Sequence, residues 1–107
     1  MQVMVVTFGF SGMSADELVE MSAALAPEFA SIPGCRAKTW LLDRAAGRAG
    51  GVYTFDDVAS VDAYRSSELW QAVEANEQFH DFESHVYEMM DAATALTHGL
   101  PQGAGAR

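Results

Sequence analysis

Three side chains in this sequence have the chemical types needed to move a proton and to hold a developing negative charge. The neutral imidazole of His85 could accept a substrate proton, although a surface histidine or one with an internal hydrogen-bond partner would explain this residue too. The ammonium group of Lys38 could hold an enolate, carboxylate or phenolate oxygen, and the Tyr53 hydroxyl could donate a hydrogen bond to such an anion. His85, Tyr53 and Lys38 are therefore the candidate catalytic residues.

Large aromatic side chains with polar tips accompany these residues, and they suit the binding of a flat polyketide-like or quinone-like compound. Core packing explains the same side chains equally well, and both interpretations stay open at this point. The candidate substrate-binding residues are Trp40, Tyr64, Trp70 and Tyr87.

Other polar residues have simpler interpretations. Arg36 alternates with Lys38 and Trp40 along one strand, although an acidic partner across the sheet would also explain it. His80 and His98 are expected in a turn and near the end of the chain, where histidines are usually solvated.

The sequence predicts neither a metal site nor a disulfide. His80, Glu83 and His85 would alternate between the two faces of a strand rather than converge on one ion. Cys35 is the single cysteine, no histidine stands beside it to activate the thiol, and we interpret it as structural.

Charge and hydropathy exclude several classes of protein. The formal net charge of −9 repels phosphate backbones, so we expect no nucleic-acid partner. No apolar run approaches the roughly 20 residues of a membrane span, and the first strand-like segment starts at Met1 without a basic leader. We expect a cytoplasmic protein with no membrane association.

Hydrophobic periodicity and turn residues divide the chain into strands and helices. Ser14 stands three residues before Glu17, the spacing of a capping box, and Pro27 is expected to kink or break the end of the helix that follows. We expect strands over residues 2–10, 35–42, 51–55 and 82–90, a helix over 14–32, and two short helices or one bent helix carrying Val58, Val61, Tyr64, Leu69, Trp70 and Val73.

This order predicts a ferredoxin-like α+β fold, βαββαβ, with a four-stranded antiparallel sheet and helices on one face. We expect one domain over residues 1–99 and a flexible tail over 100–107. The uncovered sheet face would expose a large apolar patch in a monomer, so we expect a homodimer that closes a β-barrel.

The run from Pro33 to Trp40, then Gly50 to Asp56, then Ala63 and Tyr64, resembles the YdhR-type mono-oxygenases. That family lies in the dimeric α+β-barrel group together with antibiotic-biosynthesis mono-oxygenases. The resemblance implies an oxidoreductase of secondary metabolism that oxygenates a small aromatic or polyketide-like compound, in a pocket between sheet and helices. Two alternatives stay open: an isomerase or cyclase that works through an enolate, and a non-catalytic dimer that binds haem or another small ligand.

Cofactor use is limited by what the sequence lacks. It contains no Gly-x-Gly-x-x-Gly fingerprint between a strand and a helix, so a nicotinamide or flavin domain of that type is not expected. We expect no cofactor, with haem bound through His85 or His80 as the alternative.

Overall fold

β-branched and aromatic residues with few polar neighbours place strand β1 (Gln2–Phe10) inside the sheet. β1 pairs antiparallel with β3 on one side and with β4 on the other, which gives the strand order β2-β3-β1-β4. The other elements are α1 (Ala15–Ala30), β2 (Cys35–Asp43), β3 (Arg48–Phe55), α2 (Val58–Arg65), α3 (Glu68–Ala75), β4 (Phe79–Glu88) and α4 (Asp91–Leu96).

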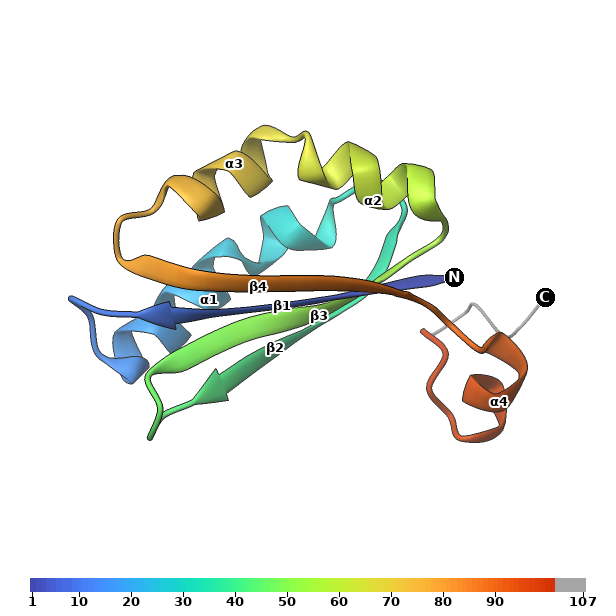
Figure 1. The fold of residues 1–107 in the computed structure, drawn as a ribbon, viewed down its shortest axis with the longest axis horizontal. Helices are drawn as coiled ribbons and strands as arrows, with labels where there is room; N and C mark the ends of the chain where they lie inside the picture. The colour runs from blue at the N-terminus through green and yellow to red at the C-terminus, as the bar shows by residue number, and fades with distance from the viewer. Residues whose placement is uncertain (102–107) are drawn as a thin grey trace.

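The computed structural model describes residues 1–101, and the helices α1, α2 and α3 all cover the same face of the sheet (Figure 1). This arrangement confirms the predicted ferredoxin-like α+β fold. Of the tail expected over residues 100–107, only Leu100 and Pro101 belong to the described residues.

The core lies between the sheet and the three helices. Met4 and Val6 of β1 alternate with half-buried residues, and both side chains are almost completely buried against the helical layer. The whole core cluster consists of Met4, Val6, Phe29, Ile32, Tyr53, Phe55, Val61, Tyr64 and Trp70. No helix of the described residues covers the second face of the sheet, and we call it the helix-free face (Figure 1).

Helix α1 begins where the capping box predicts. The Ser14 hydroxyl accepts a hydrogen bond from the backbone N–H of Glu17, and the Glu17 carboxylate accepts one from the backbone N–H of Ser14. Of the kink or break expected at Pro27, the break does not occur. The helix runs through Pro27 to Ala30, two residues short of the expected end. Only one backbone donor is lost there, and Leu18 and Phe29 still bury the same helix face against the sheet.

Two strands begin earlier than the alternation predicts. β3 begins at Arg48 rather than at residue 51, and β4 at Phe79 rather than at residue 82. A register shift between Thr7 and Gly9 of β1, with a positive φ at Asp81, interrupts the alternation of β4. The alternation of β4 is therefore visible in the sequence only after Asp81.

Helix α4 has no counterpart among the expected elements. It lies beyond the end of β4, apart from the other helices (Figure 1), and none of its residues is buried. The N-terminal ammonium group lies 3.2 Å from a carboxylate oxygen of Asp91 at the start of α4.

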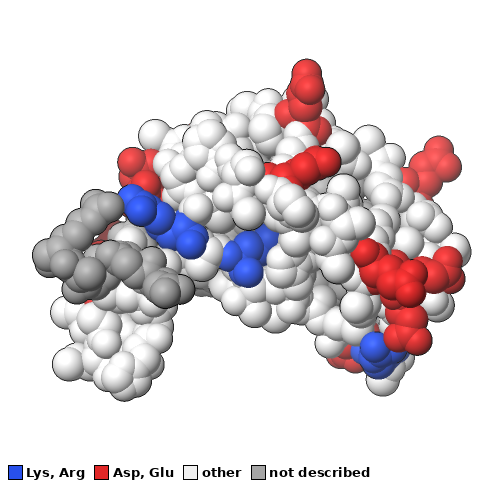
Figure 2. Space-filling view, turned by 180° about the vertical axis from the view of Figure 1, so that it is seen from behind, with Lys and Arg blue, Asp and Glu red and all other residues white. Residues whose placement is uncertain are grey.

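Within residues 1–101 no helix is long and apolar enough to cross a membrane. Acidic side chains are spread over the surface seen in Figure 2, with few basic ones among them.

Candidate active site

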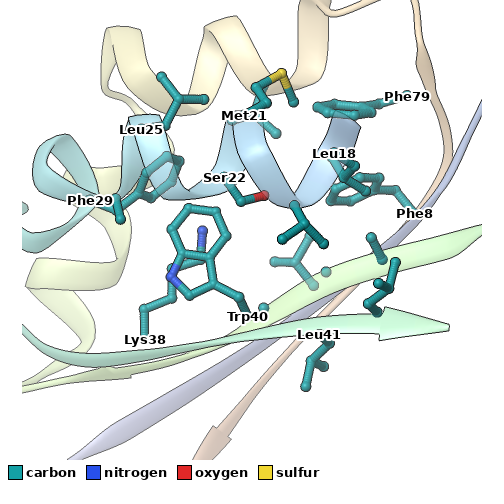
Figure 3. Close-up of a pocket in the computed structure, with 18 of the residues that line it drawn as sticks. Phe8, Leu18, Met21, Ser22, Leu25, Phe29, Lys38, Trp40, Leu41 and Phe79 are labelled. Carbon is teal, nitrogen blue, oxygen red and sulfur yellow. The ribbon is translucent and has the colours of Figure 1, made fainter. Parts of the chain in front are cut away.

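A pocket of about 390 Å³ opens between α1 and the β2–β3–β1 part of the sheet. Apolar and aromatic side chains make up nearly all of its lining, and the polar side chains among them are Ser22, Lys38 and Tyr53. In Figure 3 the Ser22 hydroxyl of α1 points into the space above the Trp40 ring, and Lys38 lies beside that ring. The site can therefore take an apolar ligand and present few polar groups to it.

The amine of Lys38 is enclosed by aromatic rings. Its Nζ lies 3.4 Å from the ring centroid of Trp40, 3.6 Å from that of Phe29 and 4.6 Å from that of Tyr53. No carboxylate among residues 1–101 forms an ion pair with it. Because burial disfavours the charged form, the pKa of Lys38 falls to about 7. At neutral pH this amine can accept a proton or donate one.

The local shape of β2 places Lys38 in the pocket. A bulge between Cys35 and Ala37 shifts the register against β3, so Lys38 pairs with Tyr53 and its side chain points to the helices. Arg36 is the extra residue of the bulge, and its Nε lies 2.6 Å from Oδ1 of Asp56. Arg36 is therefore held by an acidic partner and does not line the pocket.

Tyr53 and Tyr64 form a buried pair behind the pocket. Their hydroxyl oxygens lie 3.1 Å apart, and either can donate the hydrogen bond. Burial raises the pKa of both phenols, that of Tyr64 to about 12. Both hydroxyls therefore remain protonated at neutral pH, so Tyr53 can donate a hydrogen bond there and cannot serve as a base.

The structure brings Lys38, Trp40, Tyr53 and Trp70 together in the lining of one pocket. Tyr64 lies behind this group, with its ring centroid 5.6 Å from that of Trp70. All five come from the candidate residues that the sequence suggests.

His85 and Tyr87 lie elsewhere. In the register of β1 with β4, His85 pairs with Val5 and Tyr87 with Val3, which alternate with the core residue Met4. Both side chains therefore point to the helix-free face, away from the pocket, and both are exposed. Their ring centroids lie 6.2 Å apart. His80 lies on the same strand, and its Nδ1 is 2.9 Å from a carboxylate oxygen of Asp81.

Several pocket residues were not among the candidates. Met21, Ser22 and Leu25 of α1 line the pocket, and so do Phe8 and Phe79, whose ring centroids lie 4.5 Å apart. The apolar stripe of α1 indicates the helix wall in the sequence, but it does not tell a packed residue from one that borders a cavity.

The described residues contain no group of three or more His, Cys, Asp or Glu side chains that could hold a metal ion. This result concerns residues 1–101 alone.

Solved structures share this fold. A putative antibiotic biosynthesis monooxygenase from Deinococcus radiodurans is 18% identical, with a TM-score of 0.68 over 83% of this chain and 92% of that one. SnoaB from Streptomyces nogalater, a cofactor-independent oxygenase, is 18% identical, with a TM-score of 0.65 over 83% of this chain and 92% of that one. A MhuD variant with two manganese protoporphyrin IX groups bound per active site is 14% identical, with a TM-score of 0.65 over 84% and 95%. At these identities the likeness shows a common fold.

Neither histidine that the sequence offers as a haem ligand lines the pocket. Among the described residues its lining contains no histidine or cysteine to supply an axial imidazole or thiolate, and Tyr53 is of a type that can also serve as an axial ligand. His80 and His85 lie on β4, and His85 points away from the pocket.

Sequence comparison places the chain more specifically than its fold does. No curated protein matches it. The model of the family described as "Putative mono-oxygenase ydhR" matches residues 3–100, which is nearly all of the chain. The chain therefore belongs to the ydhR mono-oxygenase family.

Proposed function

We propose that this protein is a cofactor-independent mono-oxygenase of a small, flat aromatic or polyketide-like compound that ionises to an enolate or a phenolate. The observation that carries the proposal is the Lys38 amine, which is enclosed by three aromatic rings in an apolar pocket. Membership of the ydhR family supports it, as does the fold shared with a cofactor-independent oxygenase.

In this reaction the substrate supplies the electrons. The neutral amine of Lys38 removes a proton from an acidic ring CH₂ group, and the resulting ammonium pairs with the substrate anion. The anion transfers electrons to dioxygen and forms a C–O bond. The Lys38 ammonium then returns its proton to the peroxide, which gives a hydroperoxide and restores the neutral amine. Loss of water from the hydroperoxide leaves a carbonyl, so one oxygen atom enters the product and the other leaves as water.

The other pocket residues bind and orient the substrate in this proposal. Trp40 and Trp70 offer flat surfaces for stacking, and the Tyr53 hydroxyl can donate to the substrate oxygen while it accepts a hydrogen bond from Tyr64. The apolar lining excludes water, which strengthens the attraction between the Lys38 ammonium and the substrate anion.

His85 and Tyr87 have no role at the pocket in this proposal. They lie on the helix-free face, and we propose that this face pairs with a second copy of the chain to form the homodimer. In that case His85 and Tyr87 contact the partner rather than the substrate.

Oxygen consumption tests the proposed reaction. We would offer a panel of two- and three-ring phenolic ketones, such as dithranol, to the protein under air and under argon. We expect protein-dependent oxygen uptake, with one heavy oxygen atom in the product when isotopically labelled dioxygen is supplied.

Two variants test whether Lys38 acts as a base or only as a positive charge. Lys38→Met should lower the rate by roughly 100-fold, the typical worth of a general base, and Lys38→Arg should also be slow because arginine cannot lose its proton. Val58→Thr, on the exposed surface of α2, is the control and should keep the full rate. An unchanged rate in Lys38→Met would contradict the proposal, and turnover that continues under argon would support the isomerase or cyclase instead.

A further inference from the structure

Lys38 is the only lysine in the sequence. The other cationic side chains are all arginines, which stay protonated at any physiological pH. They are Arg36, Arg44, Arg48, Arg65 and Arg107. Apart from the N-terminal amine, Lys38 is therefore the chain's only primary amine, and it is the one cationic side chain that burial can make neutral.

The position of this amine favours covalent chemistry. A surface lysine is hydrated and charged, and it reacts slowly with carbonyl compounds near neutral pH. Lys38 instead borders the apolar pocket, and its Nζ lies against three aromatic rings. No carboxylate within residues 1–101 pairs with this amine and keeps it protonated. The lowered pKa, about 7, leaves a large part of it as free amine at neutral pH.

The rest of the lining selects the reaction partner. A compound that enters the pocket loses most of its water and meets apolar walls, so it must itself be mostly apolar. No carboxylate from the described residues lines the pocket, so a cation finds no partner among them, whereas a carbonyl group needs only the amine. The Ser22 hydroxyl also points into this space (Figure 3) and can donate a hydrogen bond to a carbonyl oxygen.

We propose that Lys38 forms a covalent imine with lipophilic, flat aldehydes or ketones that enter the pocket between α1 and β2. This activity goes beyond the oxygenation proposed above and needs no dioxygen.

The reaction balances without a redox partner. The neutral Nζ adds to the carbonyl carbon and forms a C–N bond, while a proton moves from nitrogen to oxygen and gives a carbinolamine. The carbinolamine then loses its hydroxyl group and a proton as water, which leaves the C=N bond. The apolar lining slows the return of water to that bond and so favours the imine.

Reductive trapping tests the proposal. The protein is incubated under argon at pH 7 with naphthaldehyde and sodium cyanoborohydride, which reduces an imine to a stable amine. Intact mass should show one adduct per chain, and peptide mapping should place it on Lys38 rather than on the amine of Met1. In urea the preference should reverse, because an exposed lysine has a pKa of about 10.4 and an α-amino group one of about 8.

Two alanines of α1 provide matched variants. Ala26 lines the pocket, whereas Ala24 is exposed and does not. Ala26→Phe should lower the labelling rate of Lys38 by roughly ten-fold or more through steric exclusion, and Ala24→Phe should leave it unchanged. The rate at Met1 serves as the internal reference, and Lys38→Arg should remove the Lys38 adduct while it keeps the charge. Circular dichroism checks that each variant is folded.

The results separate the two proposals. Labelling confined to Met1 in the native protein, or Lys38 labelling that is the same in native and urea-unfolded protein, would overturn the imine site. An Ala26→Phe variant that is folded and labels at the wild-type rate would overturn it too. Because the trapping is done under argon, failure of the oxygenase proposal shows only in oxygen uptake and leaves the trapping result unaffected.

Discussion

Lys38 is the residue on which most of the proposed chemistry depends. Burial removes water from its ammonium group, and the aromatic faces of Phe29, Trp40 and Tyr53 replace only part of that hydration. Cation–π contacts of this kind stabilise the charged form by about 1–2 kcal/mol. Burial acts in the opposite direction and lowers the pKa of Lys38 to about 7.

The pKa of Lys38 makes stability depend on pH. Between pH 7 and about 10.4 the unfolded chain binds a proton at Lys38 that the folded chain has lost, so the free energy of unfolding should rise with pH in that window. Below pH 7 both states are protonated, and the folded state bears the full cost of the buried charge. Lys38→Met buries no charge at this position, so it should be more stable to unfolding than the wild type at low pH. The difference in unfolding free energy should be largest near pH 6 and shrink toward pH 9.

Urea unfolding at several pH values measures this difference. Because Lys38 is the only lysine, lysine labelled with ¹³C at Cε gives a single side-chain NMR signal whose titration midpoint should lie near pH 7. A midpoint near 10 would contradict the prediction.

The buried hydroxyls of Tyr53 and Tyr64 should be energetically coupled. Tyr53→Phe leaves the Tyr64 hydroxyl without its partner in the core, and Tyr64→Phe does the reverse, so each should cost about 1–2 kcal/mol of unfolding free energy. The double variant should cost less than the sum by roughly 0.5–1 kcal/mol, since no unpaired hydroxyl remains. Additive losses in a urea double-mutant cycle would show that the pair does not matter to stability.

At the scale of elements, the pocket exists because α1 and β2 approach each other through a few large side chains. The rings of Phe29 on α1 and Trp40 on β2 meet edge to face, with centroids 5.0 Å apart. Next to them β3 contributes Gly50 and Gly51, whose small size leaves room for the neighbouring chain. α1, β2 and β3 thus hold in place the three aromatic rings of Phe29, Trp40 and Tyr53 around Lys38.

Replacing each of these glycines by alanine should have different effects. A Cβ on Gly50 would collide with the backbone of Val6 and Thr7 in β1, which cannot move without breaking the strand pairing. Gly50→Ala should therefore cost roughly 2–4 kcal/mol of stability. A Cβ on Gly51 would lie 2.8 Å from Cε of Lys38, a side chain that can shift.

Gly51→Ala is the matched variant. It should cost only about 1 kcal/mol but should move the Lys38 NMR signal and its titration midpoint, because the amine changes position among the rings. Equal losses of stability in the two variants, measured by urea unfolding, would contradict this assignment.

At the scale of the whole molecule, the sheet uses its two faces differently. The helical layer covers one face and contains the pocket, whereas no helix within residues 1–101 covers the helix-free face (Figure 1). Val5 and Val52 pair at its centre, next to Leu41, which is 38% exposed, and Tyr87, which is 56% exposed. Water disfavours such a surface, and a second copy of the same face would cover it.

A charge at the centre of this face should therefore separate the two copies. Light scattering at micromolar concentration should report a dimer for the wild type and a monomer for Val52→Glu, because two glutamates would be buried opposite each other. Val58→Glu is the control, since Val58 is 55% exposed on α2 in the helical layer, and that variant should remain dimeric. A monomeric wild type would contradict the prediction.

The sequence by itself determined the order of the elements from β1 to β4, the α+β fold and the capping box of α1, because periodicity and capping depend on neighbouring residues. Strand alternation also showed that Lys38 and Trp40 share one face of β2, and that His85 and Tyr87 share one face of β4. Alternation relates the residues of one strand to each other but does not say which face the helices cover.

Only the tertiary structure decided which of these residues meet at the pocket. The helices cover the face of Lys38 and Trp40 and leave that of His85 and Tyr87 bare, so the four candidates divide between the two sides of the sheet. The bulge at Arg36 and the low pKa of Lys38 likewise depend on β3 and α1, which are distant in sequence. Side-chain burial and charge depend on such long-range contacts, and a local pattern of residue types does not contain them.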